Sequence, residues 1–303
     1  MRSKGVSACY NASSSFVVPQ RPFVVASLSR SLSTSIGRNQ PQTCRATPFF
    51  RKHQHFHSDK HNIENKPQRM NMEAEARSTG EEVKGLEQEE VERWEGMWTQ
   101  DGGLKPGQRF DAERSSLALL HLIDTADPPL PRGRVLVPGC GRGYDLASFV
   151  KKGVATEKCV GLEISNSAIH AARHYLDQQL PSELRDKAEI RLHDFFKMHQ
   201  SEDQEHFNLI FDYTFLCAIP PQKRQDWAAQ MKRLLKPGGE LITLIFPVME
   251  KEGGPPYAMS TELVSGLLKP QGFSLVGEIA PVPPHLSHAG REGKEWLARW
   301  VSL

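Results

Sequence analysis

A short apolar segment, Arg134–Val137, leads into three glycines at alternate positions, namely Gly139, Gly141 and Gly143. Glycine allows the sharp turns and close backbone approach that a bound ligand needs, and a helix starting at Tyr144 would point its N-terminus at that ligand. Glu163 stands twenty residues after Gly143, at the end of the next apolar segment. A carboxylate there can accept hydrogen bonds from both ribose hydroxyls of an adenosine. The glycine turn and Glu163 together predict a nucleoside cofactor.

The spacing of the glycines distinguishes between classes of nucleotide-binding loop. A dinucleotide fingerprint requires glycine or alanine three residues after Gly141, and Tyr144 occupies that position. The sequence contains no Gly-x-x-x-x-Gly-Lys-Ser/Thr segment, which excludes a P-loop. A glycine turn alone is also typical of a purely structural corner between strand and helix. The residues at the other strand ends must therefore decide between a structural turn and a ligand-binding loop.

From residue 134 onward, apolar segments alternate with helical patterns. Short runs rich in Val, Ile and Leu are typical of strands covered on both faces, and they predict strands at Arg134–Val137, Lys158–Ile164, Glu189–His193, Asn208–Tyr213 and Glu240–Phe246. Two further strands are predicted at Ser274–Ile279 and Glu295–Val301. Helices are predicted at Tyr144–Lys152, Ser165–Gln179, Gln222–Leu235 and Thr261–Lys269. This alternation predicts an α/β fold with a doubly wound, mostly parallel seven-stranded sheet, whose last two strands form an antiparallel C-terminal hairpin.

Polar and aromatic residues also follow the third and fourth predicted strands. His193-Asp194-Phe195-Phe196 ends the third strand, and Phe211-Asp212-Tyr213 ends the fourth. An acid there can take an adenine amino group, and an aromatic ring can cover the base. Because ligands of a doubly wound sheet bind beyond the carboxyl ends of its strands, four such ends predict one shared site.

Charge divides the chain into two parts. Residues 1–58 hold eight Lys and Arg residues and no Asp or Glu, which leaves 30 basic and 36 acidic residues from residue 59 onward. A mildly acidic body argues against nucleic-acid binding, which needs a basic face. No apolar run approaches the ~20 residues that a membrane-spanning helix needs. Five cysteines, an odd number in a long chain, do not indicate a disulfide framework, and no cluster indicates a metal site.

Residues 1–58 have the composition of an organellar transit peptide, because they are rich in Ser and Arg and lack acids. The destination, chloroplast or mitochondrion, stays open, as do two plainer interpretations, a disordered tail and a misplaced start codon. Met70 and Met72 could start a cytosolic form. Residues 59–80 are polar without periodicity and are predicted to be a disordered linker, so that residues 81–303 form the folded domain.

A helical pattern begins near Glu81 and precedes the predicted sheet. Trp94 and Trp98 are four residues apart within it and therefore share one helical face. Two tryptophans so placed could be ordinary core residues, or their faces could attract a cationic ligand.

Several segments of the chain resemble S-adenosylmethionine-dependent methyltransferases of the thiopurine methyltransferase superfamily, and most closely its plant and fungal thiol and halide methyltransferases. The resemblance covers roughly residues 90–303, and the matching segments are Arg134–Gly143 (RVLVPGCGRG), Gly161–Ser165 (GLEIS), Phe207–Ile219 (FNLIFDYTFLCAI), Leu234–Pro247 (LLKPGGELITLIFP), Gly253–Tyr257 (GGPPY) and Gly290-Arg291-Glu292 with Trp300. It implies a class I, Rossmann-like fold with an N-terminal helical lid, and S-adenosylmethionine as cofactor without a metal.

The resemblance also implies a role for individual residues. Gly139 and Gly141 are expected to approach the methionyl part of the cofactor, Glu163 its ribose, and Asp194 with Phe195 its adenine. Tyr213 is expected beside the sulfonium as the catalytic residue, where it would polarise or position the nucleophile. Trp94 and Trp98 are expected to belong to the segment that closes over the cofactor.

Two departures from the family pattern concern the acceptor. The plant enzymes have a third lid tryptophan, whereas Gly103–Phe110 occupies that region here and Phe110 could replace the ring. The animal thiopurine enzymes have arginine where Tyr213 stands, which makes a thiopurine acceptor less expected.

The resemblance therefore implies methyl transfer to a small soft nucleophile: a thiol, bisulfide, thiocyanate or a halide ion. Such acceptors arrive as anions, and no strong general base is needed. Three alternatives stay open, namely an aryl thiol of the thiopurine kind, a carboxylate, and a cofactor-binding protein without transfer activity. The expected partners are small molecules rather than nucleic acid or membrane, and a monomer is favoured.

Overall fold

The computed structural model describes residues 88–198 and 206–303, both within the structural unit Glu64–Leu303. The predicted leader, residues 1–58, and the predicted linker, residues 59–80, lie outside the described residues. The same holds for residues 81–87, where the N-terminal helix is predicted to begin. These three boundaries therefore stay predictions.

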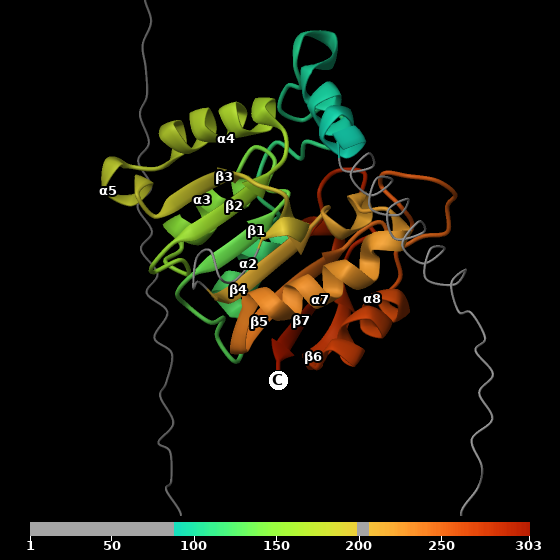
Figure 1. Ribbon diagram of the computed structural model, residues 1–303. Coiled ribbons are helices and arrows are strands. Elements are labelled where there is room, and N and C mark those ends of the chain that lie inside the picture. Colours follow the sequence, from blue (N-terminus) through green and yellow to red (C-terminus); the bar gives the residue numbers. More distant parts are fainter. Residues whose placement is uncertain (1–87, 199–205) are drawn as a thin grey trace, which may run out of the picture. The chain divides into compact units, whose positions relative to one another are not determined.

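Seven strands form one sheet in the order β3-β2-β1-β4-β5-β7-β6 (Figure 1). They are β1 (Val135–Pro138), β2 (Cys159–Glu163), β3 (Ala188–Leu192), β4 (Phe207–Tyr213), β5 (Leu235–Ile245), β6 (Phe273–Pro281) and β7 (Trp296–Ser302). The first five strands pair in parallel, whereas β7 is antiparallel to both β5 and β6. The doubly wound, mostly parallel sheet and its antiparallel C-terminal pair are thus confirmed.

The sequence did not predict the order of the last two strands or the start of β5. The returning strand β7 lies between β5 and β6, so β6 forms the edge. In addition, β5 begins at Leu235 rather than at Glu240, because Leu235 pairs with Phe207 before the register shifts. Gly238, with a φ of 76°, allows the backbone to turn within this irregular stretch.

The α-helices are α2 (Leu117–Thr125), α3 (Tyr144–Lys151), α4 (Asn166–Gln179), α5 (Ser182–Arg185), α7 (Arg224–Leu234) and α8 (Thr261–Leu268). Short 3-10 turns connect them at η1 (Gln100–Gly102), η2 (Phe195–Lys197), η3 (Leu216–Ala218), η4 (Pro221–Lys223), η5 (Lys269–Gln271) and η6 (Pro284–Leu286). Serine caps fix three helix starts, since Ser116, Ser165 and Ser260 accept hydrogen bonds from the backbone N–H of Leu119, Ala168 and Leu263.

Each face of the sheet has its own hydrophobic core, because successive strand residues point to opposite sides. One core joins Leu136 and Ile210 to residues of α7 and α8, such as Trp227 and Leu267. The other core joins Val135 and Phe211 to residues of α2, α3 and α4, such as Leu119, Phe149 and Leu176. Helices on both faces leave the carboxyl ends of the parallel strands as the place for a site.

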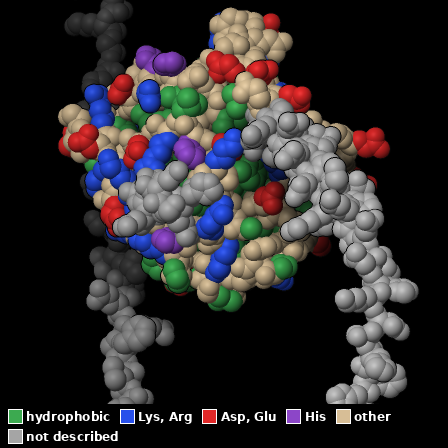
Figure 2. All heavy atoms as spheres, viewed as in Figure 1, with side chains coloured by type: hydrophobic (Ala, Val, Ile, Leu, Met, Phe, Trp, Pro, Cys, Tyr) green, Lys and Arg blue, Asp and Glu red, His purple; other side chains and the backbone are tan. Residues whose placement is uncertain are grey.

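A further helix spans residues 88–99 and precedes the sheet in sequence. It is amphipathic: Glu89 and Glu92 are exposed, whereas Trp98 is buried. Acidic side chains accordingly stand on the part of the surface that this helix forms (Figure 2). Within the described part of the chain, every helix is too short or too polar to cross a bilayer.

Candidate functional site

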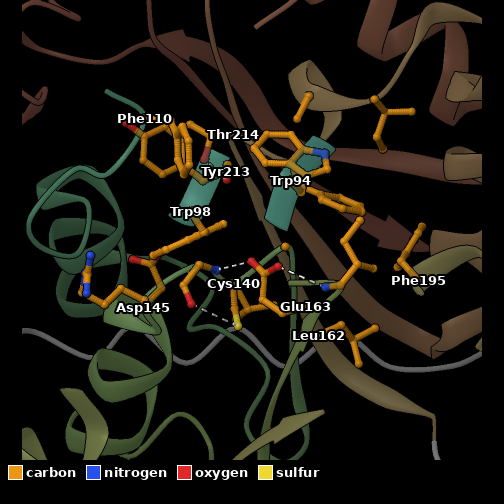
Figure 3. A pocket seen from close by; sticks show the side chains of 18 of the residues that line it. Trp94, Trp98, Phe110, Cys140, Asp145, Leu162, Glu163, Phe195, Tyr213 and Thr214 are labelled. Atoms are coloured by element: carbon orange, nitrogen blue, oxygen red, sulfur yellow. Dashed lines mark hydrogen bonds between the residues drawn. The ribbon is translucent and has the colours of Figure 1, made fainter. Parts of the chain in front are cut away.

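A cavity of about 210 Å³ lies at the carboxyl ends of β1, β2, β3 and β4 (Figure 3). All eight residues that the sequence singled out line it: Trp94, Trp98, Gly139, Gly141, Glu163, Asp194, Phe195 and Tyr213. They come from the N-terminal helix, the glycine turn and three further strand ends, so the fold brings together segments over a hundred residues apart. Their location in one pocket is observed, whereas their roles toward a ligand stay predictions.

The glycine turn needs its glycines for different reasons. Gly139 and Gly141 have φ values of 57° and 53°, in the left-handed region that other residues rarely adopt. A Cβ atom on Gly139 would lie 2.5 Å from Cδ2 of Phe215, which is far too close. A Cβ atom on Gly141 would lie 3.7 Å from Cζ2 of Trp98, which is ordinary contact. Gly139 is therefore required by both conformation and packing, and Gly141 by conformation.

Glu163 closes the turn from the neighbouring strand. Its Oε1 accepts a hydrogen bond from the Gly141 N–H at 2.7 Å, and its Oε2 accepts one from the Ile164 N–H at 3.1 Å (dashed in Figure 3). Burial raises the pKa of Glu163 to about 7, although these backbone hydrogen bonds act in the opposite direction. A carboxylate that reaches the pocket and titrates near neutrality is a candidate ligand-binding group.

Asp194 and Phe195 lie next to the end of β3. Asp194 caps η2 by accepting a hydrogen bond from the Phe196 N–H at 2.9 Å, and its other oxygen lies 3.9 Å from Nζ of Lys197. Phe195 is buried, and its ring makes edge-to-face contacts with Phe196 and Phe215. The acid and the aromatic ring therefore lie in the same part of the pocket wall, and their role toward an adenine stays a prediction.

Tyr213, at the end of β4, makes two side-chain hydrogen bonds through its hydroxyl. Its hydroxyl donates to Oε1 of Glu295 and accepts a hydrogen bond of 2.6 Å from Nη1 of Arg291. The guanidinium of Arg291 also lies over the Tyr213 ring, 5.3 Å from its centroid. Burial raises the pKa of Tyr213 well above its ordinary value, so the phenol stays neutral.

His288 stacks on the same tyrosine, with ring centroids 5.9 Å apart and an interplanar angle of 8°. It is buried, and burial lowers its pKa to about 4, with the charges of Arg291 and Arg114 adding to the effect. At neutral pH the imidazole is therefore uncharged, and it packs against the tyrosine ring as a flat, neutral partner.

The lid side of the pocket is aromatic. Phe110 makes edge-to-face contacts with Trp94, at a centroid distance of 5.5 Å, and with Trp98, at 5.7 Å. Phe110 thus stands beside both tryptophans of the N-terminal helix and itself lines the pocket (Figure 3). That Phe110 replaces a third lid tryptophan stays a prediction.

Asp111 ties this lid segment to the glycine turn. Its Oδ2 accepts from Nε of Arg142 at 2.8 Å, and its Oδ1 accepts from the Tyr144 hydroxyl at 2.8 Å. The guanidinium of Arg142 also bonds the Leu104 carbonyl and lies over the Trp98 ring. One buried carboxylate therefore holds the lid against the loop that it covers.

Glu95 anchors the N-terminal helix in a second place. Its carboxylate accepts hydrogen bonds from the hydroxyls of Ser165 and Ser167 at 2.7 and 2.5 Å and from the Ser167 N–H. These contacts outweigh the effect of burial and lower the pKa of Glu95. A negative charge at the start of α4 is favoured by the helix dipole.

Arg291, Glu295 and Asp111 were not predicted as site residues. Arg291 was noted only within a terminal motif, and the other two look like ordinary charged residues in sequence. The signal that could have found Asp111 is its position directly after Phe110. Among residues 88–198 and 206–303, no group of His, Cys, Asp and Glu side chains has the arrangement of a metal site.

Comparisons with known proteins agree with this geometry. The family model of thiopurine S-methyltransferase matches residues 89–279. The chain is 40% identical over 207 residues to probable thiol methyltransferase 2 of Arabidopsis thaliana, covering 68% of this chain and 83% of that protein. It is 39% identical over 226 residues to thiocyanate methyltransferase 1 of Brassica oleracea, covering 74% and 91%.

A solved structure supports the fold. The glycopeptide N-methyltransferase MtfA in complex with S-adenosyl-L-methionine matches with a TM-score of 0.50 at 17% identity, covering 66% of this chain and all of that one. At this identity the likeness concerns the fold alone, and it agrees with a class I methyltransferase sheet. The family match, the two plant relatives and the pocket confirm the resemblance that the motifs indicated: the chain belongs to the thiopurine S-methyltransferase family.

Proposed function

We propose that this protein transfers a methyl group from S-adenosylmethionine to a small soft nucleophile. The acceptors are a thiol, bisulfide, thiocyanate or a halide ion, and the products are a methyl thioether, methyl thiocyanate or a methyl halide. The names of the two plant relatives support a thiol or thiocyanate acceptor. The observation that carries the proposal is Arg291, a cation that lines the same pocket as the residues proposed to hold an adenosine.

The residues present fit the cofactor. The Glu163 carboxylate is held in the pocket by two backbone hydrogen bonds and would accept the ribose hydroxyls. Asp194 and Phe195 would hold the adenine, and Gly139 and Gly141 would admit the methionyl part. Trp94 and Trp98 bring two aromatic faces to the pocket, which suit a sulfonium cation through cation–π attraction.

When bound, S-adenosylmethionine supplies an electrophilic methyl group on a cationic sulfur, which a lone pair of the nucleophile displaces in line. The chain has to align the nucleophile and exclude water, so its contribution is mainly proximity and desolvation. The lid fits the second task, because Asp111 and Glu95 hold it over the pocket. An anionic nucleophile gives up no proton, so the reaction needs no base.

Arg291 would hold that anion, and Tyr213 would position it through its hydrogen bond with Arg291. The guanidinium has five N–H donors, and one of them is used by the Tyr213 hydroxyl. The ring of Tyr213 and the ring of Phe246, whose centroid is 4.7 Å from the guanidinium carbon, flank the cation. A positive charge between aromatic faces favours a large, weakly hydrated anion, as thiocyanate, iodide and thiolates are.

The experiment that tests the proposal uses the full-length protein with S-adenosylmethionine. Thiocyanate, iodide, bisulfide and an aryl thiol are supplied in turn, and methylated products are measured by headspace gas chromatography. Turnover with thiocyanate or a thiol is expected. The rate with iodide, divided by the rate with each sulfur acceptor, shows whether a halide is a comparable substrate. Cofactor binding without product from any acceptor would contradict the proposal and favour the non-catalytic alternative.

Two variants assign the acceptor side. Arg291→Met is expected to raise the KM for thiocyanate by about tenfold or more, because a charge-assisted contact is lost. Lys223→Met is the matched control, since Lys223 also lines the pocket but lies over Phe196. If Tyr213→Phe leaves turnover and cofactor affinity unchanged, the role given to Tyr213 is wrong.

We also propose that residues 1–58 direct the protein to an organelle, because their Ser- and Arg-rich, acid-free composition is typical of a transit peptide. A fluorescent protein fused behind residues 1–58 is expected in chloroplasts or mitochondria, and a fusion starting at Met72 in the cytosol. Identical cytosolic signals would contradict the targeting role. We propose a monomer as the assembly state, which light scattering tests.

A further inference from the structure

Glu295 is a buried acid outside the pocket lining. It precedes β7, and 1% of its surface is exposed. Its Oε1 accepts the hydrogen bond donated by the Tyr213 hydroxyl, from behind the pocket wall. Burial raises the pKa of Glu295, while the hydrogen bond from Tyr213 and the charge of Arg291 oppose that rise. The Ser287 side chain and the His288 backbone also favour the ionised form of Glu295. Because a buried acid costs desolvation energy, its contact with a residue of the pocket wall invites an explanation.

The direction of the hydrogen bonds supplies one. A phenol hydroxyl has one proton to donate and lone pairs to accept with. The Tyr213 hydroxyl donates its hydrogen bond to Glu295, and one of its lone pairs accepts a hydrogen bond of 2.6 Å from Nη1 of Arg291. The hydrogen bonds therefore link carboxylate, phenol and guanidinium in series, and of the three residues Tyr213 and Arg291 line the pocket. We refer to this series, Glu295–Tyr213–Arg291, as the acceptor relay.

The relay determines which group can meet a ligand. While Tyr213 donates to Glu295, its hydroxyl has no proton left for a nucleophile in the pocket. Among the described residues, the remaining N–H groups of Arg291 make no hydrogen bond, and Arg291 lines the pocket. The donors that an anion can find at this wall belong to Arg291.

We propose that Glu295 is a positioning residue of the acceptor site, an inference that rests on the proposed function above. By accepting the hydrogen bond from the Tyr213 hydroxyl, Glu295 fixes the phenol oxygen as an acceptor for Arg291. The guanidinium is then held at the pocket wall with its free N–H groups toward the nucleophile. Without Glu295 the hydroxyl is free to rotate, and it competes with Arg291 for the anion instead of orienting it.

The relay also explains the absence of a direct ion pair. The salt bridges of the described residues, which join nitrogen and oxygen atoms within 4.0 Å, do not include one between Glu295 and Arg291. A direct bidentate contact would occupy the donors of Arg291 and cancel its charge more completely. Placing a phenol between the two groups orients the arginine but leaves its donors available.

The test uses the full-length protein with three variants. Glu295→Ala removes the acceptor of the Tyr213 proton, Glu295→Gln keeps an oxygen acceptor without the charge, and Glu240→Gln is the matched control. Glu240 is likewise a buried acid, but it lies near the middle of β5 and pairs with Arg299 of β7, away from the Ile245–Trp296 pair that adjoins Glu295. The readouts are the KM for thiocyanate, its Kd measured by calorimetry with S-adenosylhomocysteine bound, the cofactor Kd and the melting temperature.

Glu295→Ala is expected to raise the KM and Kd for thiocyanate by about tenfold, with the cofactor Kd unchanged. Glu295→Gln is expected to restore most of that affinity, because its amide oxygen still accepts from Tyr213. Tyr213→Phe breaks the relay at the hydroxyl and is expected to raise the thiocyanate Kd by the same factor as Glu295→Ala. This variant tests the relay even if Glu295→Ala does not fold.

Distinct outcomes overturn the two proposals. A wild-type protein that neither methylates nor binds thiocyanate contradicts the proposed function. A functional wild type in which Glu295→Ala resembles Glu240→Gln, or loses cofactor and thiocyanate affinity equally, contradicts the positioning role. A folded Glu295→Gln as impaired as Glu295→Ala also contradicts it, because the carboxylate charge rather than proton acceptance would then matter.

Discussion

The two halves of the pocket are assembled in different ways. The cofactor half consists of a turn and strand ends that lie between Val137 and Phe195, and each part follows its own strand. The acceptor half joins Phe110, Tyr213 and the neighbouring residues Arg291 and Glu295, which come from three distant segments. Backbone conformation dominates the first half and side-chain hydrogen bonds the second. Substitutions should therefore disrupt the cofactor half by changing its shape and the acceptor half by changing its chemistry.

The largest effect is expected from Gly139→Ala. The new methyl group would lie 2.5 Å from Phe215 at a φ of 57°, so the turn has to deform. We expect a loss of about 3 kcal/mol in the free energy of unfolding and no measurable cofactor binding. Denaturant unfolding and calorimetry measure the two quantities.

Gly153→Ala is the matched control for this substitution. Gly153 has a φ of 68°, but a Cβ atom there would meet nothing within 4 Å. It should cost only the backbone strain of about 1 kcal/mol and leave cofactor binding intact. Equal losses in the two variants would mean that conformation alone, without the Phe215 contact, sets the requirement.

Asp111→Asn is expected to have the next largest effect on stability and cofactor affinity. Asp111 connects the lid segment to the glycine turn through Arg142 and Tyr144. Asparagine removes the charge that pairs with Arg142, whose side chain is 12% exposed against 2% for Asp111. Because breaking a buried pair leaves the partner uncompensated, we expect a loss of about 2 kcal/mol in stability and about thirtyfold in cofactor affinity.

Asp101→Asn provides the comparison for Asp111→Asn. Asp101 pairs with Arg109 in the same lid segment, but its side chain is 75% exposed. Exposed pairs contribute little, so stability and cofactor affinity should stay at the wild-type level. If the lid stays closed in Asp111→Asn, limited proteolysis of the N-terminal helix will be unchanged, and the assigned role of Asp111 is wrong.

The third prediction concerns the pH dependence of cofactor binding, and it tests the role of Glu163 in the cofactor half. The pKa of Glu163 is raised from an ordinary 4.5 to about 7, so below pH 7 the folded protein favours the protonated acid. Folding stability from this group is lost as the pH rises through 7, whereas ribose binding gains, because the ionised carboxylate accepts two hydrogen bonds. We expect cofactor affinity to fall by up to about tenfold per pH unit below 7 and to level off above it.

Glu163→Gln should remove this pH dependence and hold the affinity near the low-pH value. Calorimetric titrations between pH 5.5 and pH 8.5 (about three units, which span the transition) check both curves. A wild-type profile that is flat across this range would contradict a role for Glu163 in ligand binding.

The difference between the halves also explains what the sequence could predict. Strands such as Cys159–Glu163 are short apolar runs, and glycine turns carry a local pattern, so the sheet and the cofactor half followed from the sequence. The start of β5 at Leu235 did not, because it depends on one pairing with Phe207 across a register shift. Arg291 and Glu295 meet Tyr213 only through the insertion of β7 between β5 and β6, a long-range event without a local signal.

The smallest expected effect comes from Phe110, where the two halves meet at the lid. Phe110→Leu removes two edge-to-face contacts, with Trp94 and Trp98, while keeping an apolar side chain. Each contact contributes about 0.5 kcal/mol or more, so cofactor affinity should fall by about fivefold. Phe110→Trp, which supplies the ring that the plant relatives are expected to have, should keep or improve the affinity. Equal affinities in all three proteins would mean that the lid needs bulk rather than aromatic faces, and the cation–π role of Trp94 and Trp98 would lose its support.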